Sequence, residues 1–306
     1  MVSKRLWVGA YPAATTQFTE TLEIDRSATR NRLRGYIADG VDGVVMLGRC
    51  SENNSLSLRE KCALLDMATE VVDGRLPVVA GICENTASLA ADFARKAQTL
   101  GADALMLLPS PAHKSDEEEL FEYVRQVAAA TSLPVMLCVN NSSQSEKNNL
   151  RLLEWLTSVP NLTAIKVGAI GTRRIADIVN AFGDRYVLMA DLDGLALNRL
   201  VLGIKGLVSG LASAFPQEAT AFMREFAAGK LEEARRIRRW FTPLLRLNAG
   251  CDFVQSIKLA ERMMGSGSEH VRLPLLPLSG ARRAKVTAIL ENAIATRSGM
   301  RLPDAA

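Results

Sequence analysis

One lysine, Lys166, stands at the end of a short apolar stretch in which Thr163, Ala164 and Ile165 predict a buried strand. A charged ammonium group beside an apolar strand is costly unless it is paired or loses its proton. A lysine whose pKa is lowered by burial is a nucleophile that forms a Schiff base with a carbonyl group. The alternative is a lysine whose charged head reaches solvent at the strand end, and this stretch alone leaves both interpretations open.

The elements around Lys166 follow a regular alternation. Eight short apolar segments predict buried strands, and each is followed by a segment with helical spacing of its apolar residues. This alternation indicates a parallel sheet, and eight units in 306 residues favour an α/β protein with a closed (β/α)8 TIM barrel. The predicted strands are residues 7–14, 44–47, 77–81, 104–108, 134–138, 162–166, 186–190 and 206–210. The predicted helices are residues 25–38, 58–72, 87–99, 117–130, 149–157, 173–181, a short one ending at 202, and 216–228.

Three further helical patterns follow the barrel, at residues 230–247, 253–264 and 280–295. We therefore expect two parts, a barrel over residues 1–229 and a helical extension over 230–306 that packs on the barrel. No G-x-G-x-x-G follows the first strand, so the sequence does not predict a dinucleotide site.

The composition is that of an ordinary globular chain, with 48% hydrophobic and 23% charged residues. A net charge of +4 with only 5% aromatic residues does not favour nucleic-acid binding. The sequence shows no apolar run of membrane-spanning length and no signal peptide pattern. Five scattered cysteines and two distant histidines offer no metal-site spacing and suit a reducing cytoplasm, so we expect no metal and a cytoplasmic location.

In a TIM barrel the chemistry lies at the carboxyl ends of the strands. Lys166 falls at such an end, which favours its role as a Schiff-base lysine. Asp191 and Asp193 follow the seventh strand and could bind substrate hydroxyls or cap the next helix. His113 and Lys114 follow the fourth strand, where they could contact substrate or belong to a solvated loop.

Several stretches along nearly the whole chain resemble the dihydrodipicolinate synthase / N-acetylneuraminate lyase family of class I aldolase-type barrels. The chain is most similar to Δ1-pyrroline-4-hydroxy-2-carboxylate deaminases within that family. The family resemblance rests on residues 45–52 (VMLGRCSE), 77–81 (PVVAG), 101–109 (GADALMLLP), 133–135 (LPV), 164–166 (AIK) and 206–212 (GLVSGLA). The closer similarity rests on residues 15–18 (TTQF), 239–245 (RWFTPLL), 255–261 (QSIKLAE) and 267–269 (GSE).

The resemblance implies that Lys166 forms a Schiff base with a 2-oxo acid or a related imine, whose protonated C=N group stabilises a neighbouring carbanion. It also implies that the loop after the second strand holds the substrate carboxylate, here with Gly48, Arg49, Cys50 and Ser51. Val208 matches a position of the family whose backbone lies beside bound pyruvate. We expect Val208 and its neighbour Ser209 to bind the substrate. The resemblance further implies no cofactor and a homotetramer or homodimer.

The sequence departs from the family pattern at several positions of the expected site, and these departures limit which of the family's reactions we expect. Arg49 and Cys50 replace two threonines, and Ser51 replaces a glycine. Cys138 stands where the family has a proton-relaying tyrosine, and a thiol differs from a phenol in length and pKa. Ser143 matches the carboxylate-binding arginine of the synthases, and Pro111 matches a second tyrosine.

Three hypotheses follow from these departures. Dihydrodipicolinate synthesis is disfavoured, because the tyrosine and the arginine are both missing. Arg49 either supplies a cation for a substrate carboxylate or points outward and pairs with Glu52. Proton transfer, worth roughly 10²–10⁴-fold in rate, passes to Ser51, to Cys138, or to a water held by Asn140 or Asn141.

We therefore predict a Schiff-base lyase that acts on a 2-oxo acid or a cyclic imine carboxylate, with Lys166 and Cys138 as its catalytic residues. Examples of such a reaction are those of a pyrroline-4-hydroxy-2-carboxylate deaminase and of a 2-keto-3-deoxy-sugar-acid dehydratase or aldolase. The alternatives are dihydrodipicolinate synthase proper, or a catalytically degenerate barrel that binds a small carboxylate ligand.

Overall fold

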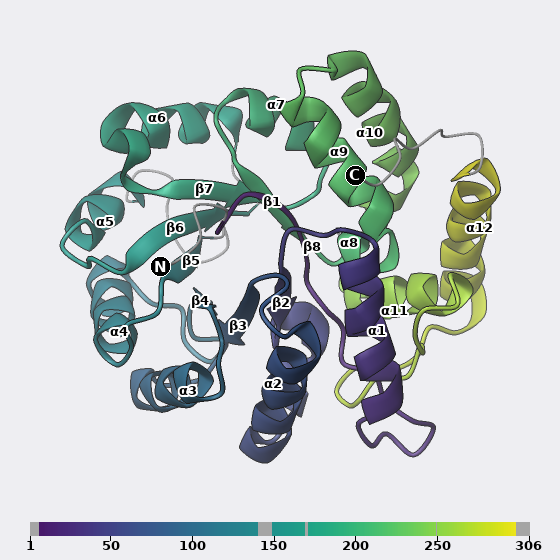
Figure 1. The fold of residues 1–306 in the computed structure, drawn as a ribbon, viewed down its shortest axis with the longest axis horizontal. Coiled ribbons are helices and arrows are strands. Elements are labelled where there is room, and N and C mark those ends of the chain that lie inside the picture. Colours follow the sequence, from purple (N-terminus) through teal and green to yellow (C-terminus); the bar gives the residue numbers. More distant parts are fainter. Residues whose placement is uncertain (1–5, 140–148, 169–170, 249, 298–306) are drawn as a thin grey trace.

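A ring of eight parallel strands forms the centre of the computed structural model, which describes residues 6–139, 149–168, 171–248 and 250–297 (Figure 1). Neighbouring strands pair in the order β1-β8-β7-β6-β5-β4-β3-β2, and a parallel bridge between Ala13 and Val45 joins the two ends. The predicted (β/α)8 barrel is therefore confirmed. The strands are β1 (Gly9–Pro12), β2 (Val44–Met46), β3 (Val78–Ile82), β4 (Ala104–Leu107), β5 (Val135–Val139), β6 (Leu162–Val167), β7 (Val187–Ala190) and β8 (Gly206–Ser209).

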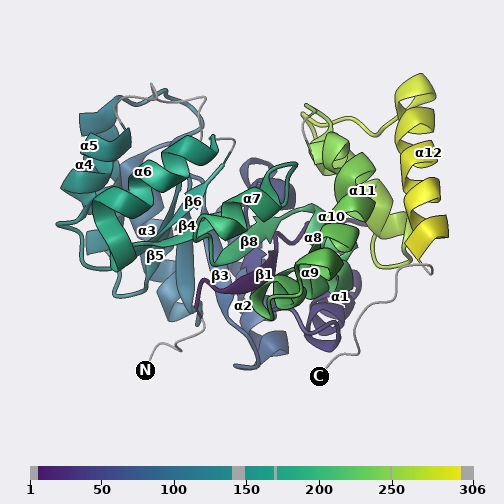
Figure 2. The ribbon, with the colours of Figure 1, turned by 90° about the horizontal axis from the view of Figure 1, so that it is seen from above.

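Helices surround this ring, and the last three gather at one side of the molecule (Figure 2). The short α8 and the single-turn 3-10 helices were not predicted, because such short turns carry no apolar periodicity. The barrel helices are α1 (Arg26–Ala38), α2 (Leu58–Val72), α3 (Ala87–Thr99), α4 (Glu117–Ala129), α5 (Asn149–Leu156), α6 (Thr172–Phe182), α7 (Ala196–Val201), α8 (Leu211–Ala214) and α9 (Pro216–Ala227). The C-terminal helices are α10 (Leu231–Leu245), α11 (Phe253–Met263) and α12 (Gly280–Arg297).

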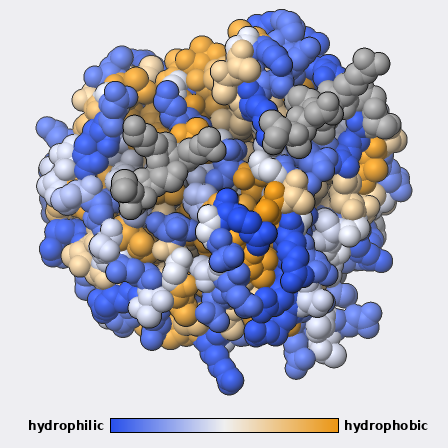
Figure 3. All heavy atoms as spheres, in the orientation of Figure 1, coloured by the Kyte–Doolittle hydropathy of each residue, from blue (hydrophilic) through white to orange (hydrophobic). Residues whose placement is uncertain are grey.

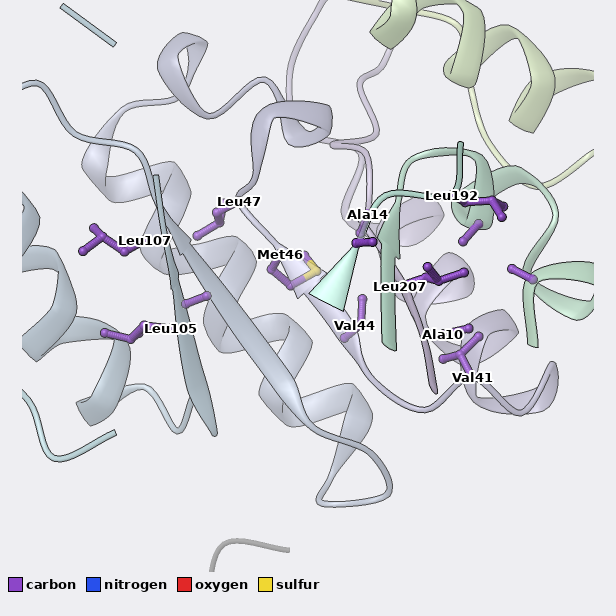
Figure 4. Packing of buried hydrophobic residues seen from close by; sticks show 14 of the residues in the cluster. Ala10, Ala14, Val41, Val44, Met46, Leu47, Leu105, Leu107, Leu192 and Leu207 are labelled. Atoms are coloured by element: carbon purple, nitrogen blue, oxygen red, sulfur yellow. The ribbon is translucent and has the colours of Figure 1, made fainter. Parts of the chain in front are cut away.

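The strands bury both of their faces, because successive side chains point to opposite sides of a strand. The outward side chains pack against the helices, as Ala10, Val44, Leu105 and Leu207 do in Figure 4. The inward side chains fill the barrel, where Tyr11, Val45, Met136 and Met189 are fully buried. On β6, Ala164 belongs to the inner cluster and Ile165 to the outer one, so Lys166 shares the inner face with Ala164.

Buried polar contacts tie α11 to the loops of the barrel. Lys258 Nζ lies 2.7 Å from Glu52 Oε1, and their side chains are 0% and 1% exposed. Glu261 accepts a hydrogen bond from Thr15 Oγ1 at 2.5 Å, and Gln17 Oε1 accepts one from the backbone N–H of Ser268 at 2.7 Å. The stretches 15–18, 255–261 and 267–269 therefore meet in space. The division at residues 229 and 230 stays a prediction.

The face seen in Figure 3 is mainly hydrophilic, with apolar residues in scattered patches. Among the described residues, none of the helices combines the length and the apolar character that crossing a membrane requires.

Removing the charge of Lys258 should destabilise the protein strongly. We expect Lys258→Met to lower the free energy of unfolding by roughly 3–5 kcal/mol, because Glu52 is left as an unpaired buried carboxylate. Urea unfolding followed by circular dichroism measures this change.

The exposed Lys96 on α3 provides the control, since Lys96→Met removes the same charge without a buried partner. The double variant Glu52→Gln/Lys258→Met should be more stable than Lys258→Met. Equal stability of Lys258→Met and Lys96→Met would contradict this account.

Candidate active site

A cavity of about 450 Å³ opens at the carboxyl ends of the strands, where the sequence predicts the chemistry. Side chains from β5, β6 and β8 meet there with the loops after β2 and β7 and with α11. The lining residues are Ala13, Gly48, Arg49, Cys50, Met106, Leu108, Cys138, Lys166, Asp191, Asp193, Val208, Gly210, Leu245, Gly250 and Phe253.

Lys166 occupies the inner face of β6 between two neighbouring strands. Cys138 of β5 is its register partner on one side and Met189 of β7 on the other. The lysine side chain is 12% exposed, so its amine is held within the mouth of the barrel and does not reach freely into solvent. This placement excludes the interpretation in which Lys166 extends its head out of the strand end.

The Lys166 amine lies 2.6 Å from Asp191 Oδ1, close enough for a charged hydrogen bond. Burial disfavours the ammonium form, but the Asp191 carboxylate and the Cys138 and Cys50 thiols act against burial, and together they raise the pKa of Lys166. The sequence left open whether the lysine is paired or has lost its proton, and the structure shows a paired lysine. The sequence offered no signal for this pair beyond the position of Asp191 after the seventh strand.

The thiols of Cys50 and Cys138 are buried in the cavity wall. Burial raises the pKa of each thiol to about 12, against the weaker opposing effects of the Lys166 and Arg49 charges. Both thiols are therefore neutral near neutral pH, and a thiol of such high pKa is a poor general base.

The loop after β2 begins with a single 3-10 turn over Arg49–Ser51, preceded by Gly48. The first N–H groups of such a turn have no acceptor within the turn itself, so those of Arg49 and Cys50 are available to a ligand. Ser51 is placed differently, because its hydroxyl donates to the carbonyl oxygen of Ala14 at 2.5 Å and its side chain does not line the cavity. Ser51 thus holds the loop against the strand-one segment.

Arg49 is exposed at the mouth of the cavity, with its guanidinium carbon 5.2 Å from the ring centre of Phe253. It does not pair with Glu52, whose two carboxylate oxygens accept hydrogen bonds from Lys258 Nζ and the backbone N–H of Arg272. The hypothesis of an Arg49–Glu52 pair is therefore wrong, and Arg49 faces the site. Sequence analysis missed Phe253, which lies at the start of α11.

The end of β8 comes close to the loop after β2. Val208 lines the cavity, whereas Ser209 is buried and its hydroxyl accepts a hydrogen bond from Leu211 N at 3.2 Å. A Cβ atom on Gly210 would lie 2.2 Å from Ile257 Cδ1 and 2.9 Å from Cys50 Sγ. Glycine at this position lets the end of β8, the loop after β2 and helix α11 approach one another at the cavity.

Asp193 also lines the cavity, but its carboxylate is occupied. One oxygen accepts a hydrogen bond from Leu195 N at 2.8 Å and the other lies 2.8 Å from Arg199 Nη1. Burial raises the pKa of Asp193, although the Arg199 charge opposes that shift. Asp193 therefore organises the start of α7.

His113 and Lys114 line a separate hollow of about 600 Å³ on the other side of Arg49 and Phe253. His113 is exposed and pairs with Glu119 at 2.9 Å. Asn140, Asn141 and Ser143 lie outside the described residues. Within the described ranges, no group of three or more histidine, cysteine, aspartate or glutamate side chains is arranged to hold a metal ion.

Comparisons with known proteins find relatives along nearly the whole chain. The model of the dihydrodipicolinate synthetase family matches residues 7–293. The 4-hydroxy-tetrahydrodipicolinate synthase of Geotalea uraniireducens is 31% identical over 291 residues, which cover 94% of this chain and 98% of that protein.

Two solved structures show the same architecture. The 4-hydroxy-tetrahydrodipicolinate synthase of Methylacidiphilum fumariolicum SolV superposes with a TM-score of 0.88 at 28% identity, covering 96% of this chain and 98% of that one. YagE of E. coli K12, solved in complex with pyruvate, gives a TM-score of 0.86 at 25% identity, covering 94% and 99%.

The buried thiols should resist alkylation in the folded protein. At pH 8 a thiol of pKa about 12 contains far less thiolate than a free cysteine, so we expect Cys50 and Cys138 to react with iodoacetamide roughly a thousandfold more slowly than a free thiol. The exposed Cys251 should be modified first. Peptide mass spectrometry over time measures each site, with urea-unfolded protein as the control. Rapid alkylation of Cys138 would show that its thiol is reactive, and Cys138 would again be a candidate proton carrier.

Proposed function

The chain belongs to the dihydrodipicolinate synthetase family, and we propose that within this family it is a Schiff-base lyase acting on a small 2-oxo acid or cyclic imine carboxylate. It is a lyase of the class I aldolase type, as this family is. The observation that carries the proposal is the Lys166 amine, which ends in a cavity of about 450 Å³ in contact with a carboxylate. A buried lysine beside a proton acceptor has little structural purpose at a barrel mouth and suits attack on a carbonyl group.

The remaining lining residues fit a substrate that carries a carboxylate. The N–H groups at the start of the Arg49–Ser51 turn can donate hydrogen bonds to its oxygens, and the Arg49 guanidinium lies at the same edge of the cavity. The backbone of Val208 lines the cavity as well. Once the lysine nitrogen bonds to C2 of a 2-oxo acid, the protonated C=N group withdraws electrons and allows a proton to leave C3.

We favour an elimination as the second half of the reaction. The leading candidate reaction is deamination of Δ1-pyrroline-4-hydroxy-2-carboxylate. The next candidate is dehydration or aldol cleavage of a 2-keto-3-deoxy sugar acid. Among the described lining residues there is no phenol to take the place of the family tyrosine, and Cys138 is a neutral thiol. Three of the four stretches that carry the resemblance to the deaminases, residues 15–18, 255–261 and 267–269, also meet in one buried network around Glu261 and Gln17.

Synthesis of 4-hydroxy-tetrahydrodipicolinate is the second candidate, because the named relatives carry that function. The cysteine at position 138 argues against it. We also propose that the chain forms a homodimer or homotetramer, which sedimentation would test.

Borohydride reduction in the presence of pyruvate should fix a covalent adduct on Lys166. Hydride adds to the C=N bond of the Schiff base and makes it permanent, so intact mass spectrometry shows the added mass and peptide mass spectrometry shows its site. Lys166→Ala should give no adduct and should lose turnover.

A matched control is Lys61→Ala, since Lys61 also pairs with a carboxylate, that of Glu84 at 2.6 Å, but does not line the cavity. Wild-type protein that binds 2-oxo acids without forming the adduct would overturn the Schiff-base proposal. If adducts form, the ligands trapped on Lys166 would guide a comparison of the deaminase, dehydratase and synthase reactions.

Arg49→Met should weaken substrate binding through its carboxylate. Loss of one charge-assisted hydrogen bond costs about 1.5–3 kcal/mol, so we expect KM to rise roughly 10- to 150-fold with little change in kcat. Steady-state kinetics on the substrate identified by the screen measures both. Arg95→Met on the exposed face of α3 is the control, and an unchanged KM in Arg49→Met would show that Arg49 does not contact the substrate.

A further inference from the structure

We propose that Asp191 is the proton carrier of the reaction, taking a proton first from the Lys166 ammonium and then from C3 of the bound substrate. This inference rests on the proposed function and adds a catalytic residue to it. It assigns to a carboxylate after β7 the task for which the sequence suggested Ser51, Cys138 or a bound water.

The first support is contact with the reacting atom. Asp191 Oδ1 lies 2.6 Å from Lys166 Nζ, within the range expected for proton transfer between a base and the group it deprotonates. In the Schiff base, C2 is bonded to Nζ and C3 is bonded to C2, so C3 lies about 2.5 Å from the nitrogen that Asp191 already contacts. The Asp191 side chain is 32% exposed and lines the cavity, which leaves it open to a substrate.

The second support is the state of the other candidates. The hydroxyl of Ser51 is donated to Ala14 O, and the thiol of Cys138 is neutral. Asp193 has both oxygens engaged, by Leu195 N and by Arg199. In the part of the chain that the structure describes, Lys166 is the one hydrogen-bond partner of Asp191. Asp191 is thus the lining carboxylate whose hydrogen-bond partner is the reacting amine itself.

The steps of Schiff-base formation balance with Asp191 in this role. Nζ gives one proton to Asp191, and its lone pair then bonds to C2 of the 2-oxo acid while the C=O pair moves to oxygen. A second proton shifts from nitrogen to that oxygen. Asp191 then protonates the hydroxyl group, water leaves, and the nitrogen lone pair forms the protonated C=N bond.

The same carboxylate then serves the second half of the reaction. Asp191 takes a proton from C3, the C–H pair forms the C2=C3 bond, and the C=N pair returns to nitrogen. In an elimination, the nitrogen pair restores C=N, the C2=C3 pair becomes C3=C4, and the bond from C4 to its hydroxyl breaks. The proton on Asp191 leaves with that hydroxyl as water.

Pyruvate separates this role from Schiff-base formation, because its methyl protons exchange with solvent only when C3 is deprotonated. We would measure borohydride trapping on Lys166 and loss of the pyruvate methyl signal in D₂O by NMR, for wild type, Asp191→Asn, Asp191→Glu and Glu84→Gln. Glu84→Gln is the matched control, since it changes a carboxylate 2.6 Å from a lysine outside the cavity.

We expect Asp191→Asn to form the adduct more slowly but to reach the same final extent of trapping at pH 8 within about twofold, while the rate of methyl exchange falls roughly 10²- to 10⁴-fold. Trapping persists because the amide no longer stabilises the ammonium form of Lys166. Asp191→Glu should exchange the methyl protons at least tenfold faster than Asp191→Asn. Glu84→Gln should match wild type in both measurements.

Two results would overturn the role of Asp191. Exchange that stays at the wild-type rate in Asp191→Asn would exclude it as the base at C3. A parallel loss of exchange and of the final extent of trapping in Asp191→Asn, with no recovery in Asp191→Glu, would show that Asp191 only positions Lys166. Failure of the wild type to form any adduct is a different outcome, which removes the proposed function and this inference together.

Discussion

The ion pair of Lys166 and Asp191 is the interaction on which the site depends, because it favours the ammonium form of the lysine that we propose as the nucleophile. Burial alone would favour a neutral lysine, and the carboxylate at 2.6 Å, with the neighbouring thiols of Cys138 and Cys50, acts against that preference. The unliganded protein therefore holds an ammonium group next to the base that can remove its proton. In the proposed Schiff base, a positively charged iminium takes the place of the Lys166 ammonium beside the same Asp191 carboxylate. The local charge is therefore unchanged, and the reaction does not require a new charge to be buried.

The loop after β2 faces that ion pair across the cavity, and it is held from several directions. Ser51 binds Ala14, and Asn53 Nδ2 donates to Leu47 O at 2.6 Å. Glu52 joins the loop to Lys258 on α11, the helix whose first residue, Phe253, stacks with Arg49. Helix α11 therefore does more than cover the barrel, since it contacts the loop that we propose to bind a carboxylate and carries the aromatic ring beside it. A rigid loop preserves the geometry that a turn of free N–H groups needs.

Most of the fold follows from periodicity that can be read along the chain. Apolar runs of strand length alternating with helical patterns predicted the barrel, and the strand-end rule placed Lys166, Arg49 and Asp191 at one mouth. The pairing within that mouth could not be predicted, because it depends on side-chain direction and on distances between segments far apart in the chain. Glu52 illustrates this, since its neighbour in sequence is Ser51 and its actual partner is Lys258, 206 residues away. The direction of the Lys166 pKa shift depended on the same missing information.

The exchange of a tyrosine for Cys138 has a geometric consequence when the proton moves to Asp191. Cys138 is on β5 and Asp191 follows β7, and these strands flank β6 on opposite sides. A proton carried by a side chain at position 138 would reach the Schiff base from the β5 side, whereas Asp191 reaches it from the β7 side. A substrate that eliminates with help from Asp191 must therefore present its C3 hydrogen and its leaving group toward β7. The short thiol of Cys138 then leaves room on the β5 side of the cavity for the rest of the substrate, which a tyrosine in its place would occupy.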